Sequence, residues 1–374
     1  MSEIRPFALA ISQSQLDDLN QRIEATRWPE KEAVDDWSQG TPLAALQDLL
    51  DYWRSGYDWR ICEAKLNALG QFITEIDGLD IHFIHHRSPH ADALPLIMTH
   101  GWPGSVIEFL GVIEALANPA DGSQPFHVVA PSLPGFGFSG KPSAAGWGVE
   151  KIARAWSELM GRLEYTRWFA QGGDWGSAVT TSIGVQALPG CAGIHLNMPI
   201  GRPLPEDLEN PSVSELKALA ALKYYQEWDA GYSTQQRTRP QTVGYGLVDS
   251  PAGLAGWILE KMWAWTDNQG SPYDALSRDQ ILDNLMLYWL PATGASSARL
   301  YWESFARFAP RQIAIPVAIS AFPKEILPTP RKWAERDMPQ LVHWGDMDKG
   351  GHFAAWEQPE LFVSELRTAF ALMR

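Results

Sequence analysis

The order of strand-like and helix-like segments is the feature that most constrains the fold of this chain. Short apolar segments with the character of buried strands lie at residues 94–98, 126–130 and 168–171. A helical pattern at residues 149–163 separates the last two of them. Strands that alternate with helices in this way pair in parallel, because the helix carries the chain back to the start of the sheet. We therefore predict an α/β fold whose mostly parallel sheet has helices on both faces.

One long interruption divides this alternation. Residues 201–310 are rich in Tyr and Trp and have a helical pattern without a clear strand, and the alternation resumes at residues 313–319 and 340–344. A helical insertion inside an α/β core is typical of a lid over an active site. We predict four regions: an N-terminal extension with the first strands of the core (1–92), the first part of the core (93–200), the helical lid (201–310) and the second part of the core (311–374).

The N-terminal extension begins with two predicted helices. Ser12 is a suitable N-cap for the first, and the second covers about residues 42–52. Two alternating segments follow, at 72–76 and 79–84, and the Asp77-Gly78 pair between them predicts a β-hairpin. We expect the helices either to pack on the lid of the same chain or to contribute to the contact of a homodimer.

Composition excludes several classes of protein. The net charge of −14 and pI near 5.1 argue against nucleic acid or an anionic membrane as a partner. Cys62 and Cys191 form neither a disulfide framework nor a zinc motif. No signal peptide and no apolar run long enough to span a membrane is visible. We expect a soluble, cytoplasmic protein that needs no metal and no cofactor.

The segment Gly172-Gly-Asp174-Trp-Gly176 lies between a predicted strand and a predicted helix. Small residues on both sides of Asp174 permit the sharp strand-to-helix turn of a nucleophile elbow, in which the central side chain is pushed out of the fold. An ordinary glycine-rich turn is the alternative. The loop His100-Gly-Trp102-Pro-Gly favours the elbow, because the backbone N–H groups of Trp102 and Trp175 would together form an oxyanion hole. We expect His100 itself to be structural.

His352 and Glu325 complete a predicted triad. Among the nine histidines, His352 alone lies in a Gly-rich turn after the last predicted strand, where this type of fold places its base. Glu325 follows the preceding strand, which gives the chain order nucleophile, acid, histidine. Asp346 and Asp348 are alternatives for the acid, but they lie on the same loop as His352. The triad, the oxyanion loop and the strand order together predict an α/β-hydrolase fold.

A carboxylate nucleophile narrows the reaction. An aspartate that attacks a saturated carbon forms an alkyl ester, whose carbonyl a second step can hydrolyse with water activated by the histidine. Epoxides and haloalkanes are the two obvious electrophiles. An epoxide needs an acid for its alkoxide, whereas a halide needs N–H donors such as the indole of Trp175. The predicted lid offers several tyrosines, and spacing alone cannot choose among them: Tyr224, Tyr225, Tyr232, Tyr245, Tyr273, Tyr288 and Tyr301.

Tryptophans are unusually numerous in this chain, and many of them cluster in the predicted lid, at Trp257, Trp263, Trp265, Trp289 and Trp302. Such a cluster suits an aromatic-lined pocket for an apolar ligand. Among these five we single out Trp263 as a substrate-binding residue, beside Trp102 and Trp175. A binding scaffold without catalysis is a further alternative, although the intact nucleophile, base, acid and oxyanion loop argue against it.

The chain resembles the microsomal and juvenile-hormone type of epoxide hydrolase over nearly its whole length. The resemblance rests on these motifs: Arg27-Trp-Pro, His100-Gly-Trp-Pro-Gly-Ser, Gly172-Gly-Asp-Trp-Gly, Asp249-Ser-Pro-Ala-Gly-Leu-Ala, Phe322-Pro-Lys-Glu and Gly350-Gly-His-Phe-Ala-Ala. It implies the nucleophile Asp174, the base His352 and the acid Glu325, and it assigns Tyr232 and Tyr301 to epoxide ring opening.

The resemblance also implies a class of substrate. Apolar epoxides of aryl, terpenoid or biosynthetic origin, together with water, are the expected substrates. Microsomal members begin with a membrane-anchoring segment, and the first residues of this chain contain no such pattern. We therefore expect a soluble, bacterial-style relative. Haloalkane dehalogenation with the same triad stays the main alternative.

Overall fold

A computed structural model describes residues 3–305 and 312–374 of the chain. Within these residues a nine-stranded sheet has the order β1-β2-β3-β5-β4-β6-β7-β8-β9. The pairs β1–β2, β2–β3 and β3–β5 are antiparallel, and every pair from β5–β4 to β8–β9 is parallel. The mostly parallel sheet is therefore as predicted. Its strands are β1 (Arg5–Phe7), β2 (Gln71–Ile76), β3 (Leu79–His86), β4 (Leu94–Thr99), β5 (Phe126–Pro131), β6 (Trp168–Gly172), β7 (Cys191–Leu196), β8 (Val317–Ala321) and β9 (Leu341–Asp346).

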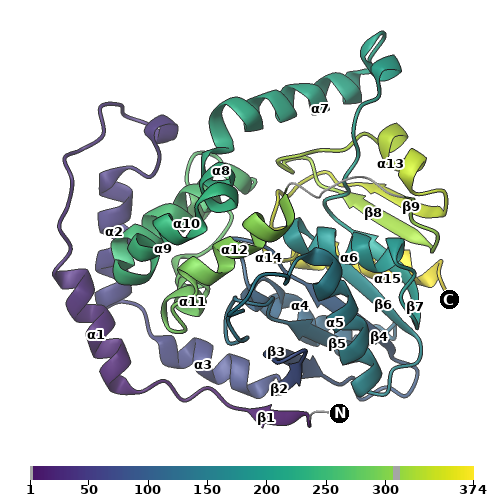
Figure 1. Cartoon of the computed structure of the whole chain (residues 1–374), viewed down its shortest axis with the longest axis horizontal. Helices are drawn as coiled ribbons and strands as arrows, with labels where there is room; N and C mark the ends of the chain where they lie inside the picture. The colour runs from purple at the N-terminus through teal and green to yellow at the C-terminus, as the bar shows by residue number, and fades with distance from the viewer. Residues whose placement is uncertain (1–2, 306–311) are drawn as a thin grey trace.

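Helices cover both faces of the sheet (Figure 1). One pair in contact is α5 (Val149–Arg162) with α6 (Asp174–Val185), and another is α4 (Leu110–Ala117) with α15 (Pro359–Ala371). The strands between these pairs are almost fully buried, with β6 buried along its whole length. Parallel strands need this two-sided cover, and their continuous apolar character follows from it. The remaining core helices are α13 (Arg331–Asp337) and α14 (Ala354–Glu357).

The N-terminal helices lie on the helical insertion of the same chain (Figure 1). Ser12 caps α1 (Gln13–Glu24) through a capping box, as its sequence position predicts. Arg22 pairs with Asp249 at 3.2 Å, and the Tyr52 hydroxyl donates to Asp279 at 2.8 Å. These contacts support the first of the two packing arrangements expected from the sequence. The other helices of the extension are α2 (Leu43–Ser55) and α3 (Trp59–Ala68).

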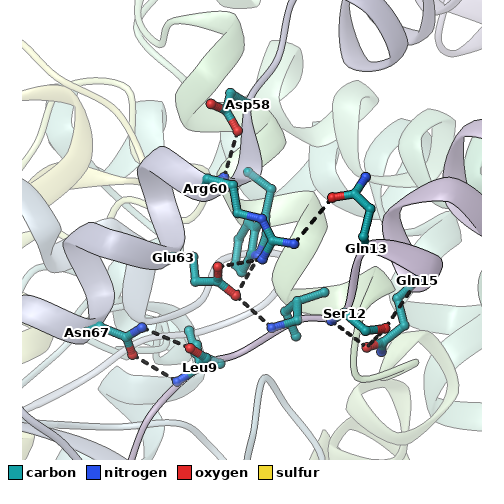
Figure 2. Close-up of polar contacts among 10 residues, drawn as sticks. Leu9, Ser12, Gln13, Gln15, Asp58, Arg60, Glu63 and Asn67 are labelled. Carbon is teal, nitrogen blue, oxygen red and sulfur yellow. Dashed lines mark hydrogen bonds and ion pairs between the residues drawn. The ribbon is translucent and has the colours of Figure 1, made fainter.

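Side chains of α3 hold the extended segment that leads from β1 to α1 (Figure 2). Asn67 accepts from the Leu9 N–H at 2.8 Å and donates to the Leu9 carbonyl at 2.9 Å. The Glu63 carboxylate accepts from the Ile11 N–H at 2.7 Å and from Arg60 at 2.6 Å. The side chains thus replace the strand partner that this segment lacks, because its backbone groups need hydrogen bonds where they are partly buried.

The insertion contains helices and no strand within its described residues 201–305. Its helices are α7 (Val213–Tyr224), α8 (Gly231–Thr238), α9 (Pro240–Asp249), α10 (Pro251–Trp265), α11 (Arg278–Trp289) and α12 (Gly294–Ser304). A short π-helical turn, η4 (Tyr225–Asp229), joins α7 to α8. The helical pattern read from the sequence is therefore confirmed, while the predicted end of the region at residue 310 lies outside the described residues.

The structure differs from the sequence-based expectations at two places. The strand expected from Ile313 begins only at Val317, because Pro316 has no N–H to donate to a ladder and restricts the residue before it. Helix α3 was not expected, although Asp58 caps its first turn. The hairpin of β2 and β3 does turn at Asp77 and Gly78, which both have positive φ.

Replacement of Glu63 tests how the extension is held. In Glu63→Ala the partly buried N–H of Ile11 loses its acceptor, so we expect the free energy of unfolding to fall by about 2 kcal/mol. Glu63→Gln keeps an acceptor oxygen and should lose less than about 1 kcal/mol. Urea unfolding of the two variants provides the measurement. Equal losses would mean that the ion pair with Arg60, rather than the backbone hydrogen bond, holds the segment.

Candidate active site

Asp174 begins α6 directly after β6, at the strand-to-helix turn predicted from the sequence. Its φ is +49°, a value that a non-glycine residue adopts only when its surroundings enforce it. Two close approaches show how the turn is held. A Cβ on Gly172 would lie 2.1 Å from the Gly176 carbonyl oxygen, and one on Gly176 would lie 1.8 Å from the Thr99 carbonyl oxygen. The flanking glycines therefore let α6 start against the end of β4.

The loop after β4 reaches the Asp174 carboxylate. The backbone N–H of Trp102 donates to Asp174 Oδ1 at 2.7 Å. The N–H of Trp175, in the first turn of α6, is the second predicted donor of the oxyanion hole and stays a prediction. His100 is buried and structural, since its Nε2 accepts from the Leu133 N–H at 3.1 Å. Burial lowers the pKa of His100 to about 4, so this imidazole is neutral near pH 7.

His352 lies between the other two members of the predicted triad. Its Nδ1 is 2.8 Å from Glu325 Oε1, and its Nε2 is 3.3 Å from Asp174 Oδ2. Glu325 follows β8 and His352 follows β9, and a bridge between Lys324 and Gly351 joins the two loops. Asp346, one alternative acid, instead accepts from the Trp344 indole at 2.9 Å. The geometry therefore favours Glu325 as the acid.

The charge of His352 depends on the two carboxylates. Burial alone would lower the pKa of this imidazole, but the charges of Glu325 and Asp174 and their hydrogen bonds raise it well above the usual range. The imidazolium form is therefore stable while both carboxylates are ionised. Any event that neutralises Asp174 removes one of the two stabilising charges and makes the ring easier to deprotonate.

The helical insertion holds the loop that carries His352. The His352 N–H donates to the Trp265 carbonyl at 2.9 Å, and the Gly350 N–H donates to Asp267 at 2.9 Å. The Glu357 carboxylate accepts from the N–H groups of Asp267, Gly351 and Phe353, and burial raises its pKa to about 7. These bonds tie the end of α10 to the loop that carries His352.

Tyr232 on α8 and Tyr301 on α12 meet above Asp174. Both are buried, with ring centroids 5.8 Å apart and ring planes at 81°. The Tyr301 ring also packs edge-on to Trp175 at 4.8 Å. Burial, reinforced by nearby phenols and the Asp174 charge, raises the pKa of both tyrosines well above 10. Both hydroxyls therefore stay protonated and can act as hydrogen-bond donors.

A buried charge cluster fixes the ring of Tyr232. Its face stacks on Trp102 at 4.8 Å, and the Lys261 ammonium lies 4.7 Å from the ring centroid. Lys261 pairs with Asp229 at 2.6 Å, and Asp229 also accepts from the Trp265 indole at 2.7 Å. The Tyr225 hydroxyl lies 3.3 Å from that of Tyr232. Sequence reasoning missed Lys261 and Asp229, because only the fold brings α8, α10 and η4 together.

A cavity of about 770 Å³ opens from Asp174 between the insertion and the sheet. This volume is in the range of small-molecule sites. Trp175, Tyr232 and Tyr301 line its inner end. Apolar side chains supply much of the remaining wall, among them Met198, Ile200, Leu222, Phe305, Leu327 and Trp333.

Most of the tryptophans expected at the pocket lie elsewhere than in the lining of this cavity. Trp263 stacks on Trp37 of the N-terminal extension at 5.2 Å and is not among the residues that line the cavity. Two positions along a helix turn a side chain through about 200°, so Trp263 and Trp265 of α10 cannot face the same side. Trp265 packs on His352 at 5.0 Å, whereas Trp302 is 55% exposed. Trp175 and Trp333 are the tryptophans that line this cavity.

Within residues 3–305 and 312–374, no group of three or more His, Cys, Asp or Glu side chains is arranged to hold a metal ion. Across the same residues, no helix has both the length and the apolar character needed to cross a membrane.

Comparison with known proteins gives the family. Residues 4–109 match the family model for the epoxide hydrolase N terminus, and residues 95–246 match that for the alpha/beta hydrolase fold. Epoxide hydrolase 1 of Sus scrofa is 36% identical over 99% of this chain and 89% of its own. The chain belongs to the epoxide hydrolase family. A Stigmatella aurantiaca protein, provisionally named as an epoxide hydrolase, is 53% identical over 99% of this chain and 86% of its own.

The solved structures agree with this family. An Aspergillus niger epoxide hydrolase matches with a TM-score of 0.91 and 33% identity, over 100% of this chain and 97% of its own. The predicted α/β-hydrolase fold, the predicted family and the predicted class of enzyme, a hydrolase of the epoxide hydrolase type, are therefore confirmed. The roles of single residues rest on the geometry described above.

The close packing at the elbow generates a stability test for this epoxide hydrolase. Gly176→Ala would press a methyl group against the Thr99 carbonyl, so we expect a loss of more than about 3 kcal/mol in the free energy of unfolding. Gly161→Ala, in α5, meets no atom within 4 Å and should stabilise by about 0.5–1 kcal/mol. Chemical denaturation of both variants measures these changes in the free energy of unfolding. Similar stabilities would show that the elbow tolerates a side chain and is not packed as described.

Proposed function

We propose that this chain hydrolyses apolar epoxides to vicinal diols through a covalent ester on Asp174. One observation supports the proposal above all. The Asp174 carboxylate lies at the inner end of an apolar cavity with two protonated tyrosines, and it also lies 3.3 Å from a histidine paired with a second carboxylate. An acid for the leaving oxygen and a base for water are thus present on either side of one nucleophile.

Ring opening is the first step of the proposed mechanism. Tyr232 and Tyr301 donate hydrogen bonds to the epoxide oxygen, while Asp174 Oδ2 attacks a ring carbon from the opposite side. The carbon–oxygen bond of the ring breaks as the new bond to Oδ2 forms, and a phenol supplies the proton for the alkoxide. Oδ1, which accepts from the Trp102 N–H, becomes the carbonyl oxygen of the ester. The same donor is therefore in place for the oxyanion of the second step.

Ester hydrolysis is the second step, and it can begin only when His352 has lost its charge. When Asp174 becomes an ester its negative charge disappears, and the pKa of His352 falls because one of two stabilising carboxylates is gone. The ring then gives up its proton, which restores the phenol, and the neutral ring accepts a proton from water as the water oxygen attacks the carbonyl carbon. Collapse breaks the bond to the diol oxygen, which takes that proton from His352, and leaves Asp174 as a carboxylic acid. The second proton of the water then passes from this acid to His352, so the carboxylate and the imidazolium of the free protein are both restored.

The cavity supports an apolar substrate. Its wall carries aliphatic and aromatic side chains beyond the tyrosines, so a substrate with an aryl or terpenoid body would bury its surface there. We infer that the insertion, predicted over residues 201–310, acts as the lid of this cavity. A homodimer stays a prediction from the sequence.

Haloalkane dehalogenation is the competing function. It needs two N–H donors beside the nucleophile for the halide, and the Trp175 indole is one candidate. Two buried phenols at the same place favour an epoxide instead, because a halide leaves without needing a proton.

Replacement of His352 tests the covalent route. In His352→Gln, Asp174 keeps its attacking oxygen but water loses its base, so the ester should accumulate after mixing with styrene oxide. Intact-protein mass spectrometry should show a gain equal to the mass of the epoxide. Asp174→Ala is the control and should show no gain. If His352→Gln binds the epoxide without forming an adduct, the covalent route fails.

Replacement of the two tyrosines distinguishes epoxide hydrolysis from haloalkane dehalogenation. Tyr232→Phe with Tyr301→Phe removes both donors, so the alkylation rate on an epoxide should fall about 100-fold or more. Tyr245→Phe is the control, because Tyr245 is 70% exposed on the surface of the insertion. Stopped-flow tryptophan fluorescence reports the step through Trp175. Unchanged halide release from a bromoalkane in the double variant would favour the dehalogenase.

A further inference from the structure

A second, much smaller cavity lies beside the triad. It shares only Asp174 with the residues that line the large cavity, so the nucleophile separates the two spaces. Its volume is about 10 Å³. A cavity of roughly 10–15 Å³ by this measure holds a single water molecule. The chamber is lined by these residues, among others: Gly101, Glu108, Gln171, Asn197, His352 and Phe353.

This chamber has the chemistry that a single water requires. Water needs two to four polar partners where it is buried. His352 and Asp174 border the chamber from one side, and the Glu108 carboxyl borders it from the loop after β4. A water here would lie next to the carboxylate carbon that the ester step must attack and next to the ring that must take its proton.

Glu108 is held in this position by its own loop. It belongs to a short 3₁₀ helix, η2 (Val106–Phe109), and its carboxyl lies within hydrogen-bonding reach of the backbone N–H groups of Gly101 and Ser105. The carboxyl passes over Gly104 so closely that a Cβ there would lie 1.6 Å from Glu108 Oε1. Gly104 is therefore required by the side chain of Glu108, and not by a turn of the backbone.

We infer that this chamber holds the water that hydrolyses the ester, and that Glu108 positions this water against the carbonyl carbon of the Asp174 ester. The inference rests on the function proposed above. His352 Nε2 accepts one hydrogen of the water, and the C=O oxygen of the Glu108 side-chain carboxyl accepts the other. A lone pair of the water oxygen then points at the ester carbon. Attack forms the carbon–oxygen bond, and the proton passes to His352, as in the ester step described above.

The charge state of Glu108 agrees with this role. Burial raises the pKa of Glu108, His352 opposes the rise and the Asp174 charge adds to it, so that the pKa lies at about 8. At neutral pH the group is therefore an uncharged acid. An uncharged acid can accept a hydrogen bond from water without repelling the oxyanion that forms on the ester.

Replacement of Glu108 separates the two chemical steps. Glu108→Leu leaves the tyrosines and Asp174 in place, so the alkylation rate with styrene oxide should stay within about threefold of wild type. Hydrolysis of the ester should slow about 100-fold, because the water is no longer oriented. Glu108→Gln keeps the carbonyl acceptor and should lose roughly tenfold or less. Single-turnover fluorescence and the accumulated adduct mass provide the two readouts.

A second variant tests the same role without removing the carboxyl. Gly104→Ala leaves Glu108 in the chain but pushes its side chain out of the chamber, so it should also slow hydrolysis more than alkylation. Glu114→Leu, an exposed glutamate on α4 that pairs with His86, is the matched control and should change neither rate. Thermal unfolding of each variant establishes that it is folded.

Three outcomes would count against the inference. Equal slowing of both steps in Glu108→Leu would show a structural role, unchanged hydrolysis would show that Glu108 does not hold the water, and full activity in Gly104→Ala would contradict the packing. Failure of the proposed function would give a different experimental result from failure of this inference. In that case His352→Gln would form no adduct, whatever the effect of Glu108.

Discussion

The structure depends on one constrained residue, Asp174, whose backbone has a φ of +49° at the junction of β6 and α6. This conformation brings the carboxylate to the Trp102 N–H on one side and to the His352 ring on the other. The strain persists because the glycines at 172 and 176 let α6 and β4 close around the turn. The backbone thus fixes the position of the two Asp174 carboxylate oxygens. The two tyrosines, His352 and Glu325 are arranged around them.

The electrostatics of the site follow from placing one imidazole between two carboxylates. Their combined charge keeps His352 protonated in the free protein, a state in which it cannot act as a base. Esterification of Asp174 would cancel one charge, and His352 would become a base only when there is an ester to hydrolyse. In the proposed mechanism the order of the two steps therefore follows from charge, and no conformational change is needed to impose it. Glu325 keeps the ring oriented throughout, since its bond is to the other nitrogen.

The sequence predicts the parts of the site that lie on loops after parallel strands. Such loops meet at one edge of the sheet, so Asp174, Trp102, Glu325 and His352 could be placed together from their strand positions alone. The contributions of the insertion are different. Tyr232 and Tyr301 came from the family resemblance. Trp263 stacks on Trp37 and not along the cavity, because the phase of α10 depends on which neighbours it packs against. Lys261 and Asp229 carry no signal in sequence spacing, since helix packing brings them to Tyr232.

The separation of the two cavities has a consequence for the evolution of the site. The large cavity reaches Asp174 from the side of the helical insertion. The small chamber reaches Asp174 and His352 from the side of the core. If the proposed function holds, substitutions in the insertion would alter which epoxide fits without contacting the small chamber. The chamber is lined by residues of the parallel strands, of the loops that follow them and of the core helices. A site built in this way can change its substrate while its second step stays constant.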